Sequence, residues 1–110
     1  MLATQNHHFM SIVDVYVASI GDMTEEKMAL VQELWSHKIR AEANFQTNPQ
    51  AGEILKYCKN NNIRLLVTFK KVVYNSSNKV KVKDLEKKTE SDEIRDTLVK
   101  VIKLKLAHYS

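Results

Sequence analysis

The order of hydrophobic and polar residues along this 110-residue chain predicts strands that alternate with helices. Segments rich in β-branched and aromatic residues predict strands at 13–19 (VDVYVAS), 39–45 (IRAEANF) and 63–69 (IRLLVTF). The third segment is almost continuously apolar, which is typical of a central strand covered on both faces. Apolar residues at helical spacing predict one helix over about 22–37 and a second over about 49–59.

Capping signals mark where the two helices begin. Asp22 or Thr24 is the expected cap of the first helix, and Asn48 is the expected cap of the second, with Pro49 at its first position. Each helix has one apolar face that should pack on the sheet, so Trp35 is expected in the core rather than as a platform for a stacked base. The first face consists of Met28, Val31, Leu34 and Trp35, and the second of Ala51, Ile54, Leu55 and Cys58.

The remaining C-terminal residues predict two more strands and a last helix. KKVVYNSSNKVKVKDL (70–85) suggests two strands around an NSSN turn, and KKTESDE (87–93) a polar connection. The last helix is expected from about Ser91, with Ile94, Leu98, Val101 and Ile102 on one face. The order β-α-β-α-β-β-β-α, or the same with one strand fewer, predicts an α/β fold in three layers. We expect a mixed, mostly parallel five-stranded sheet with three helices.

Length and composition are those of one globular domain. Residues 1–12 show no periodicity and are expected to be a flexible lead-in or linker, which leaves 13–110 as the domain. The chain has no long apolar run and no secretory signal pattern, and its one cysteine cannot form an internal disulfide. We therefore expect a cytoplasmic protein without membrane contact.

Positive charge is concentrated in the middle of the chain. Residues 1–55 have a net charge of −4 and residues 56–88 a net charge of +8. Lys79, Lys81 and Lys83 alternate with two valines, so a strand would present these three lysines as one row on a single face. Such a row is either a solvated edge or a surface for a polyanion. The other cations of this segment favour a nucleic-acid backbone; they are Lys56, Lys59, Arg64, Lys70, Lys71, Lys87 and Lys88.

The residues suggest no catalytic, cofactor or metal site. The chain has two glycines, so a glycine-rich phosphate loop is excluded. Its four histidines and single cysteine show no metal-ligand spacing, and Cys58 lies on an apolar helix face, where a buried thiol is expected rather than a nucleophile. Tyr57, between Lys56 and Lys59, either stacks a base or covers the surface.

Five stretches follow one another in a specific order: VDVYVASIGD, LVQELWSHKIRAE, NPQAGEILKYCKNNNIRLLV, KVKVKDLEKK and LVKVI. Together they resemble the anticodon-binding domain of histidyl-tRNA synthetases, from about Val13 to Leu106. The resemblance implies a class II anticodon-binding fold without catalytic residues, which grips the anticodon stem-loop of a tRNA. It further implies a parent histidine-tRNA ligase with other domains, and leaves room for a homodimer formed through that parent.

The resemblance implies RNA contacts in two places. It points to Gln46, Thr47, Asn48 and Gln50 at the start of the second helix, and to Lys79, Lys81 and Lys83. The basic segment adds Lys56 as a nucleic-acid-binding residue. A helix start is a favourable place for an anion, and lysines can hold phosphates while amide side chains recognise base edges.

Some positions depart from the synthetase pattern. Lys38, Asn62 and the NSSN turn stand where the family commonly has glycine, and KKVVYNSS replaces an acidic, glycine-containing stretch. VASIGDM and EILKYCKNNNI also resemble the synthetase-like region of the starvation-responsive kinase that phosphorylates a translation initiation factor, a region that senses uncharged tRNA. The alternative is therefore a regulatory domain of that kinase.

Overall fold

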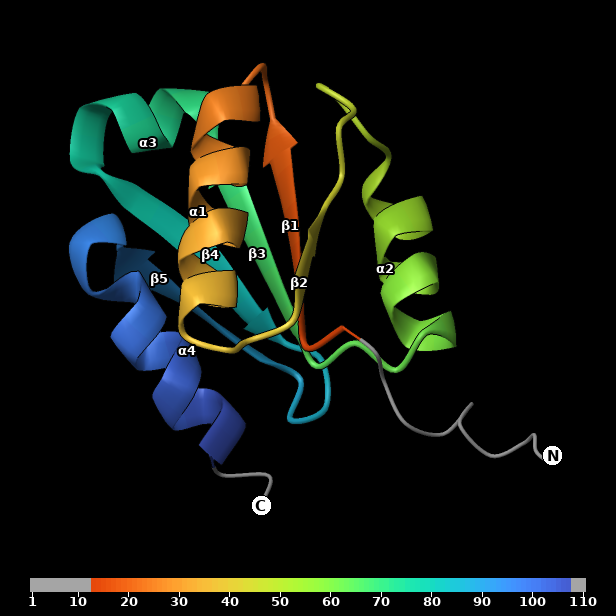
Figure 1. Ribbon diagram of the computed structural model, residues 1–110. Coiled ribbons are helices and arrows are strands. Elements are labelled where there is room, and N and C mark those ends of the chain that lie inside the picture. Colours follow the sequence, from red (N-terminus) through yellow and green to blue (C-terminus); the bar gives the residue numbers. More distant parts are fainter. Residues whose placement is uncertain (1–12, 108–110) are drawn as a thin grey trace, which may run out of the picture.

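The computed structural model describes residues 13–107, which form a five-stranded sheet between two layers of helices (Figure 1). The expected lead-in at 1–12 lies outside the described residues. The strands are β1 (Val15–Ile20), β2 (Ala41–Ala43), β3 (Leu65–Lys70), β4 (Lys79–Asp84) and β5 (Thr89–Ile94), in the spatial order β2-β1-β3-β4-β5. The helices are α1 (Thr24–Ser36), α2 (Ala51–Asn60), α3 (Lys71–Ser77) and α4 (Leu98–Ala107), with a 3-10 turn, η2 (Arg95–Thr97), before α4.

The sheet is mixed. β1 pairs in parallel with β2 and with β3, and β4 pairs antiparallel with β3 and with β5. Parallel neighbours need a crossover, which α1 and α2 provide. The predicted three-layer α/β fold with a mixed five-stranded sheet is confirmed, although parallel and antiparallel pairings are equal in number and residues 13–107 hold four helices instead of three.

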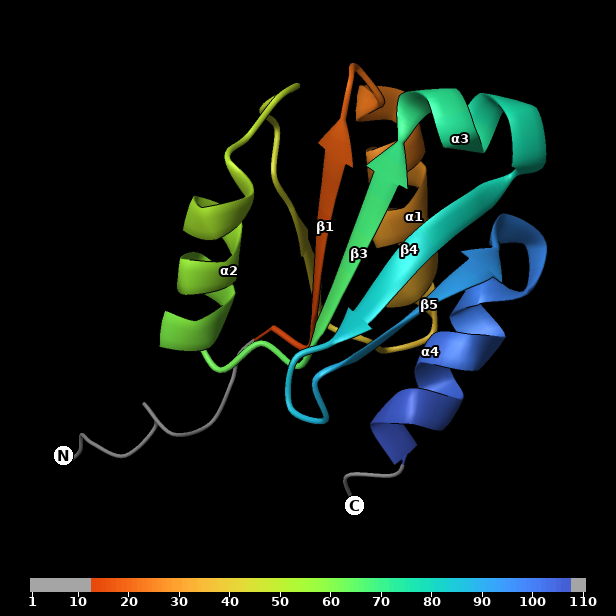
Figure 2. The same cartoon turned by 180° about the vertical axis from the view of Figure 1, so that it is seen from behind.

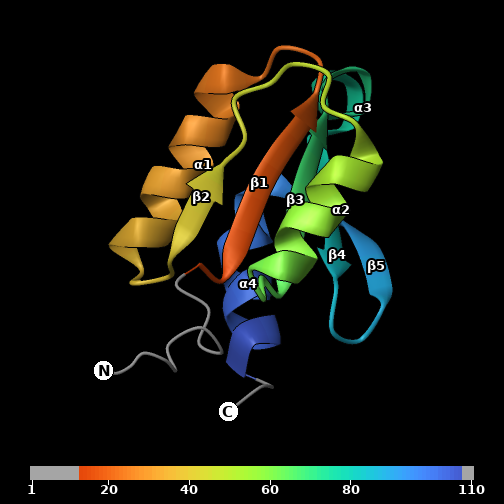
Figure 3. The same ribbon diagram turned by 90° about the vertical axis from the view of Figure 1, so that its right-hand side faces the viewer.

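The two faces of the sheet are covered unequally. α1 and α4 pack on one face and α2 on the other (Figure 3). The core under α2 is small and takes its sheet residues from β1 and β3; it consists of Tyr16, Ala18, Ile54, Cys58, Ile63 and Leu66. On this side no helix of residues 13–107 covers β4 and β5, so within the described part of the chain their face beside α2 is open (Figure 2). The lysines of β4 belong to that open face.

The buried face of α1 is rotated from the predicted one. Its buried residues are Lys27, Leu30, Val31 and Leu34. Trp35 is 57% exposed, and its Nε1 donates a 2.9 Å hydrogen bond to the carbonyl oxygen of Ala41. The prediction that Trp35 lies in the core was therefore wrong. The indole ring instead bonds to the adjacent edge strand, while a lysine takes the buried position one turn before Leu30 and Val31.

The chain after β3 also differs from the prediction. KKVVYNSS is not a strand: α3 forms there, and the ring of Tyr74 packs edge-on against Phe69 with centroids 5.1 Å apart. Valines favour strands, but Val72 and Val73 are exposed here, and the segment serves only to connect β3 to β4. Most of the predicted polar connection is β5, an edge strand on which charged residues are tolerated. Consequently Ile94 ends β5, and the last helix begins at Leu98 rather than near Ser91.

Three helices end at left-handed residues that are not glycine, and the third of these residues is Asn78, with φ 60°, after α3. After α1, the N–H of Ile39 donates to the carbonyl oxygen of Leu34 at 2.9 Å, and Lys38 has φ 63°. After α2, the N–H of Ile63 donates to the carbonyl oxygen of Cys58 at 2.9 Å, and Asn62 has φ 56°. This is the Schellman ending, which usually places glycine at the left-handed position. Lys38 and Asn62 thus adopt the left-handed conformation typical of glycine. Both stand at positions where the synthetase pattern commonly has glycine.

Candidate nucleic-acid interface

The connections from β1 to α1, from β2 to α2 and from β3 to α3 meet at the carboxyl edge of the parallel strands. β1 turns toward α1 at Gly21, which has φ 98° and donates its N–H to the carbonyl oxygen of Thr47 at 2.7 Å. A Cβ on Gly21 would lie 2.8 Å from the Cβ of Lys71, so the start of α3 packs against the same turn. Open α/β sheets bind ligands at this edge. Gly21 is therefore needed both for its backbone conformation and for the close approach of α3.

A buried lysine holds the loop between β2 and α2. The side chain of Lys27 is enclosed, with 1% exposure, and its Nζ donates to the carbonyl oxygens of Asn44 at 2.7 Å and Gln46 at 3.3 Å. Burial lowers the pKa of Lys27 because desolvation disfavours the ammonium, while the carboxylate of Asp22 acts in the opposite direction. The side-chain oxygen of Asn44 accepts a 2.9 Å hydrogen bond from the N–H of Gln46, and its side-chain nitrogen donates a 3.1 Å hydrogen bond to the hydroxyl of Tyr16.

A groove of about 330 Å³ lies between α2 and the open half of the sheet. One part of its lining is apolar and comes mainly from α2, β1 and β3; it includes Ile20, Ile54, Leu55 and Leu66. The other part is polar and comes from β3, β4 and β5; it includes Thr68, Lys70, Lys81, Lys83 and Glu90. Such a lining offers an apolar surface for a planar base beside cations for its phosphates.

The predicted lysines divide between the groove and its surroundings. Lys81 and Lys83 line the groove, on the face of β4 opposite to its buried valines, so the expected alternation is confirmed. Lys79 is exposed at the start of β4 and lines an adjoining pocket with Lys70 and Lys81. Lys56 is exposed on α2 and is not part of the groove lining.

The predicted polar residues before α2 do not line the groove, although their neighbours Pro49 and Ala51 do. Gln46, Thr47 and Asn48 are exposed in the loop before α2, and Pro49 lines the groove. The cap position of α2 is Gln50, which makes no side-chain capping bond. Asn48 is therefore not the helix cap, and Pro49 precedes the helix instead of starting it. The chain reaches helical geometry only at Ala51, because Gln50 is still extended, with φ −77° and ψ 128°.

The lysine row carries its own counter-charges. Lys81 Nζ lies 3.4 Å from an oxygen of Glu90 and 3.3 Å from one of Asp92, and Lys83 Nζ lies 3.6 Å from the other oxygen of Glu90. These carboxylates raise the pKa of Lys81, with the hydrogen bond to Asp92 as the largest cause. The pattern of residues 87–93 predicts a polar connection, so it gave no sign that Glu90 and Asp92 pair with these lysines.

Two neighbouring residues of α2, Tyr57 and Cys58, have structural roles. The hydroxyl of Tyr57 donates to the carboxylate of Glu42 at 3.0 Å, and its ring lies 5.0 Å from that of Tyr16. Tyr57 thus packs on the surface of the domain. The thiol of Cys58 is fully buried, as expected, and burial raises its pKa to about 12.

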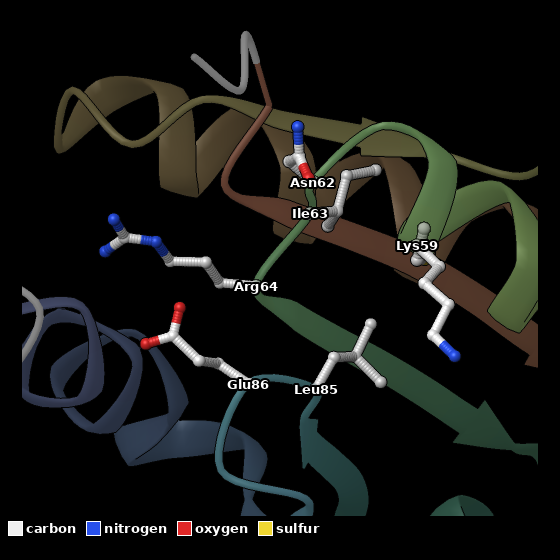
Figure 4. Close-up of a pocket in the computed structure, with 7 residues that line it drawn as sticks. Lys59, Asn62, Ile63, Arg64, Leu85 and Glu86 are labelled. Atoms are coloured by element: carbon white, nitrogen blue, oxygen red, sulfur yellow. The ribbon is translucent and has the colours of Figure 1, made fainter. Parts of the chain in front are cut away.

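A second pocket, of about 350 Å³, lies at the far end of α2, where β3 begins and β4 ends. Figure 4 shows the carboxylate of Glu86 extending toward the side of the pocket where Arg64 lies, with Lys59 on the other side. Lys59 and Arg64 of the basic segment line this pocket, but none of the eight residues to which RNA contacts were assigned does. We therefore take the α2 groove as the candidate interface.

Two further observations concern the described part of the chain. Between residues 13 and 107 no helix is long and apolar enough to cross a membrane. The same residues contain no group of three or more histidine, cysteine, aspartate or glutamate side chains placed to hold a metal ion.

Comparison with known sequences identifies the class of domain. Residues 10–109 match the sequence profile of a family described as the anticodon binding domain of tRNAs, and the chain belongs to this family. A search of curated protein sequences returns no match.

Two tRNA synthetases are among the solved structures that share the fold. Histidyl-tRNA synthetase from Nostoc sp. PCC 7120 superposes with a TM-score of 0.79 at 21% identity, over 87% of this chain and 23% of that one. Prolyl-tRNA synthetase from Cryptosporidium parvum, in complex with L-proline and AMP, gives a TM-score of 0.71 at 17% identity, over 87% of this chain and 21% of that one. The chain thus spans less than a quarter of the length of either synthetase, and at these identities the likeness concerns the fold.

Proposed function

We propose that this domain binds the anticodon stem-loop of a tRNA in the groove between α2 and β4. The observation that carries the proposal is that one groove combines two kinds of lining: apolar side chains such as Ile20 and Leu55, and lysines such as Lys70 and Lys81. An unstacked base needs an apolar or aromatic surface, and its flanking phosphates need cations. Membership of the anticodon-binding family supports the same partner.

We assign two kinds of contact to the predicted residues. Lys56, Lys79, Lys81 and Lys83 contact phosphates, and the polar side chains of Gln46, Thr47, Asn48 and Gln50 recognise base edges. The hydrogen bonds from Lys27 support the second assignment, because a loop held at two carbonyl oxygens loses less conformational freedom on binding.

We place the domain in a cytoplasmic parent of the histidyl-tRNA synthetase type. The order of sequence motifs supports this assignment, and so does the fold shared with the Nostoc enzyme. In such a parent the domain would contact other domains of its own chain and, through them, a second copy.

A second candidate is the regulatory domain of the tRNA-sensing kinase. The stretches VASIGDM and EILKYCKNNNI favour it, because they resemble the synthetase-like region of that kinase. Such a domain would bind tRNA without regard to the anticodon.

Binding of the 110-residue chain to a histidine-tRNA anticodon stem-loop tests both candidates. The control RNA keeps the stem and scrambles the loop, and each is titrated at about 50 and about 200 mM salt, a range over which phosphate contacts weaken strongly. Salt-sensitive binding that prefers the histidine loop supports the synthetase assignment, and equal binding to both loops supports the kinase. Failure to bind either RNA contradicts the RNA-binding function.

A further inference from the structure

We infer that Glu90 and Asp92 limit nonspecific RNA binding by competing with phosphate for the lysines of β4. The inference rests on the proposed function and deepens it. In this view an RNA that offers only phosphates must displace the carboxylates from the lysines. Its net gain in binding free energy is therefore small. An RNA that also inserts a base into the apolar side of the groove has a further source of affinity, which the carboxylates do not oppose.

The register of the hairpin places each acidic residue opposite its lysine. Asp92 pairs with Lys81, and Glu90 pairs with Lys83. Directly opposed residues of an antiparallel pair have side chains close enough to interact. Glu90 also reaches Lys81, so it bridges two neighbouring lysines at 3.4 and 3.6 Å. The carboxylates therefore occupy the positions that phosphate oxygens would take beside these ammonium groups.

The ion pairs can open. The side chains of Glu90 and Asp92 are 47% and 62% exposed, and exposed ion pairs contribute little stability. The carboxylates are part of the same hairpin as the lysines, however, so they act at a high effective concentration. They weaken phosphate binding without blocking it.

The location of the two residues fits a role at the interface. Glu90 lines the α2 groove together with Lys81 and Lys83, and Asp92 lines the adjoining pocket with Lys70 and Lys79. The neighbouring acidic residue of β5, Glu93, stands opposite the buried Val80 and therefore on the other face of the sheet, where it accepts a 2.7 Å hydrogen bond from the hydroxyl of Ser91. β5 thus offers a matched control within the same strand.

The test replaces the competing carboxylates by neutral isosteres in the 110-residue chain. The double variant Glu90→Gln/Asp92→Asn should bind the scrambled-loop RNA about three- to tenfold more tightly at low salt, since each exposed pair is weak. Two freed lysines should steepen the salt dependence by about 1.4 in log–log slope. Affinity for the histidine loop should rise by a similar factor, because the carboxylates compete only with the phosphate contacts that both RNAs share.

Glu86→Gln/Glu93→Gln is the control, because it changes the net charge equally but leaves both lysine partners in place. An equal gain in this control, or no gain in the first variant, would overturn the inference. In those cases binding by the unmodified chain still supports the proposed function. If neither the chain nor the first variant binds RNA, both are overturned. Matching heat-unfolding curves establish that the variants are folded.

Discussion

The ammonium of Lys27 lies 2.7 Å from the carbonyl oxygen of Asn44, so a residue of α1 holds the loop that leads into α2. α1 and α2 cover opposite faces of the sheet (Figure 3). The hydrogen bond therefore joins the two helical layers at the carboxyl edge of the strands, next to the candidate RNA groove. A buried ammonium needs such partners, because an unpaired buried charge is costly.

Replacing this lysine by a side chain of similar length tests its role. Lys27→Met should lower the free energy of unfolding by about 1–3 kcal/mol, because the carbonyl oxygens of Asn44 and Gln46 lose their donor. It should also weaken binding of the anticodon stem-loop. Urea unfolding and RNA titration measure the two effects. Lys100→Met, at an exposed position of α4, is the control, and equal behaviour of the two variants would contradict this role for Lys27.

The left-handed lysine after α1 predicts a stabilising substitution. Lys38 has φ 63°, a conformation that costs a residue with a Cβ roughly 1–2 kcal/mol. Lys38→Gly should therefore raise the free energy of unfolding by about 0.5 kcal/mol, after allowance for the greater freedom of glycine in the unfolded chain. Asn62→Gly should have a smaller effect, because asparagine tolerates this conformation. Ser36→Gly, inside the last turn of α1, should instead destabilise, and destabilisation by Lys38→Gly would be inconsistent with the turn described here.

A phosphate contact by the lysine row has a characteristic salt signature. Lys81→Gln should weaken binding to all RNAs alike and reduce the salt slope by less than about one, because Glu90 and Asp92 already neutralise part of the charge of Lys81. Lys100→Gln is again the matched control. Unchanged binding by Lys81→Gln would mean that the lysines of β4 form a solvated edge and serve only to stabilise the hairpin.

Asn48, just before α2, can be tested for a structural role and for a binding role separately. Asn48 makes no capping bond to α2, so Asn48→Ala should change the free energy of unfolding by no more than about 0.5 kcal/mol. If its amide contacts a base, the same variant should alter the preference among loop sequences. A loss of about 1 kcal/mol in urea unfolding would instead indicate that Asn48 caps the helix.

The buried thiol predicts slow chemical labelling. Burial raises the pKa of Cys58 from 9.0 to about 12, so at pH 8 the folded chain should contain about a thousandfold less thiolate than the unfolded chain. Labelling with a thiol reagent should thus be fast in denaturant and very slow without it. Between pH 9 and 12 the unfolded state loses the thiol proton and the folded state retains it, so stability should fall as pH rises. Rapid labelling of the folded protein would contradict the burial of Cys58.

The sequence was most informative where burial and periodicity agree. The β-branched, apolar runs at β1 and β3 and the apolar stripe of α2 predicted elements that the structure contains. α3 was missed because its valines favour strands yet lie on the surface. β5 was missed because an exposed edge strand made of charged residues lacks the apolar alternation that marks most strands.

The candidate interface was predictable only in part. The spacing of the lysines in β4 predicted that they lie on one face of the sheet, because the alternation of side chains is a local property of a strand. Their pairing with Glu90 and Asp92 depends on the hairpin register, which the sequence pattern did not reveal. Lys27 carried one recognisable signal: it lies three and four residues before Leu30 and Val31, which places it on the buried face of α1.

The central claim is that RNA lies on the α2 side of the sheet, and amide chemical shifts of the labelled chain test it most directly. Titration with the anticodon stem-loop should shift residues 44–50 and 68–70 and the lysines of β4, and should leave α4 unchanged. Shifts confined to α4 and the outer face of α1, or shifts around Arg64 and Glu86 alone, would contradict the account.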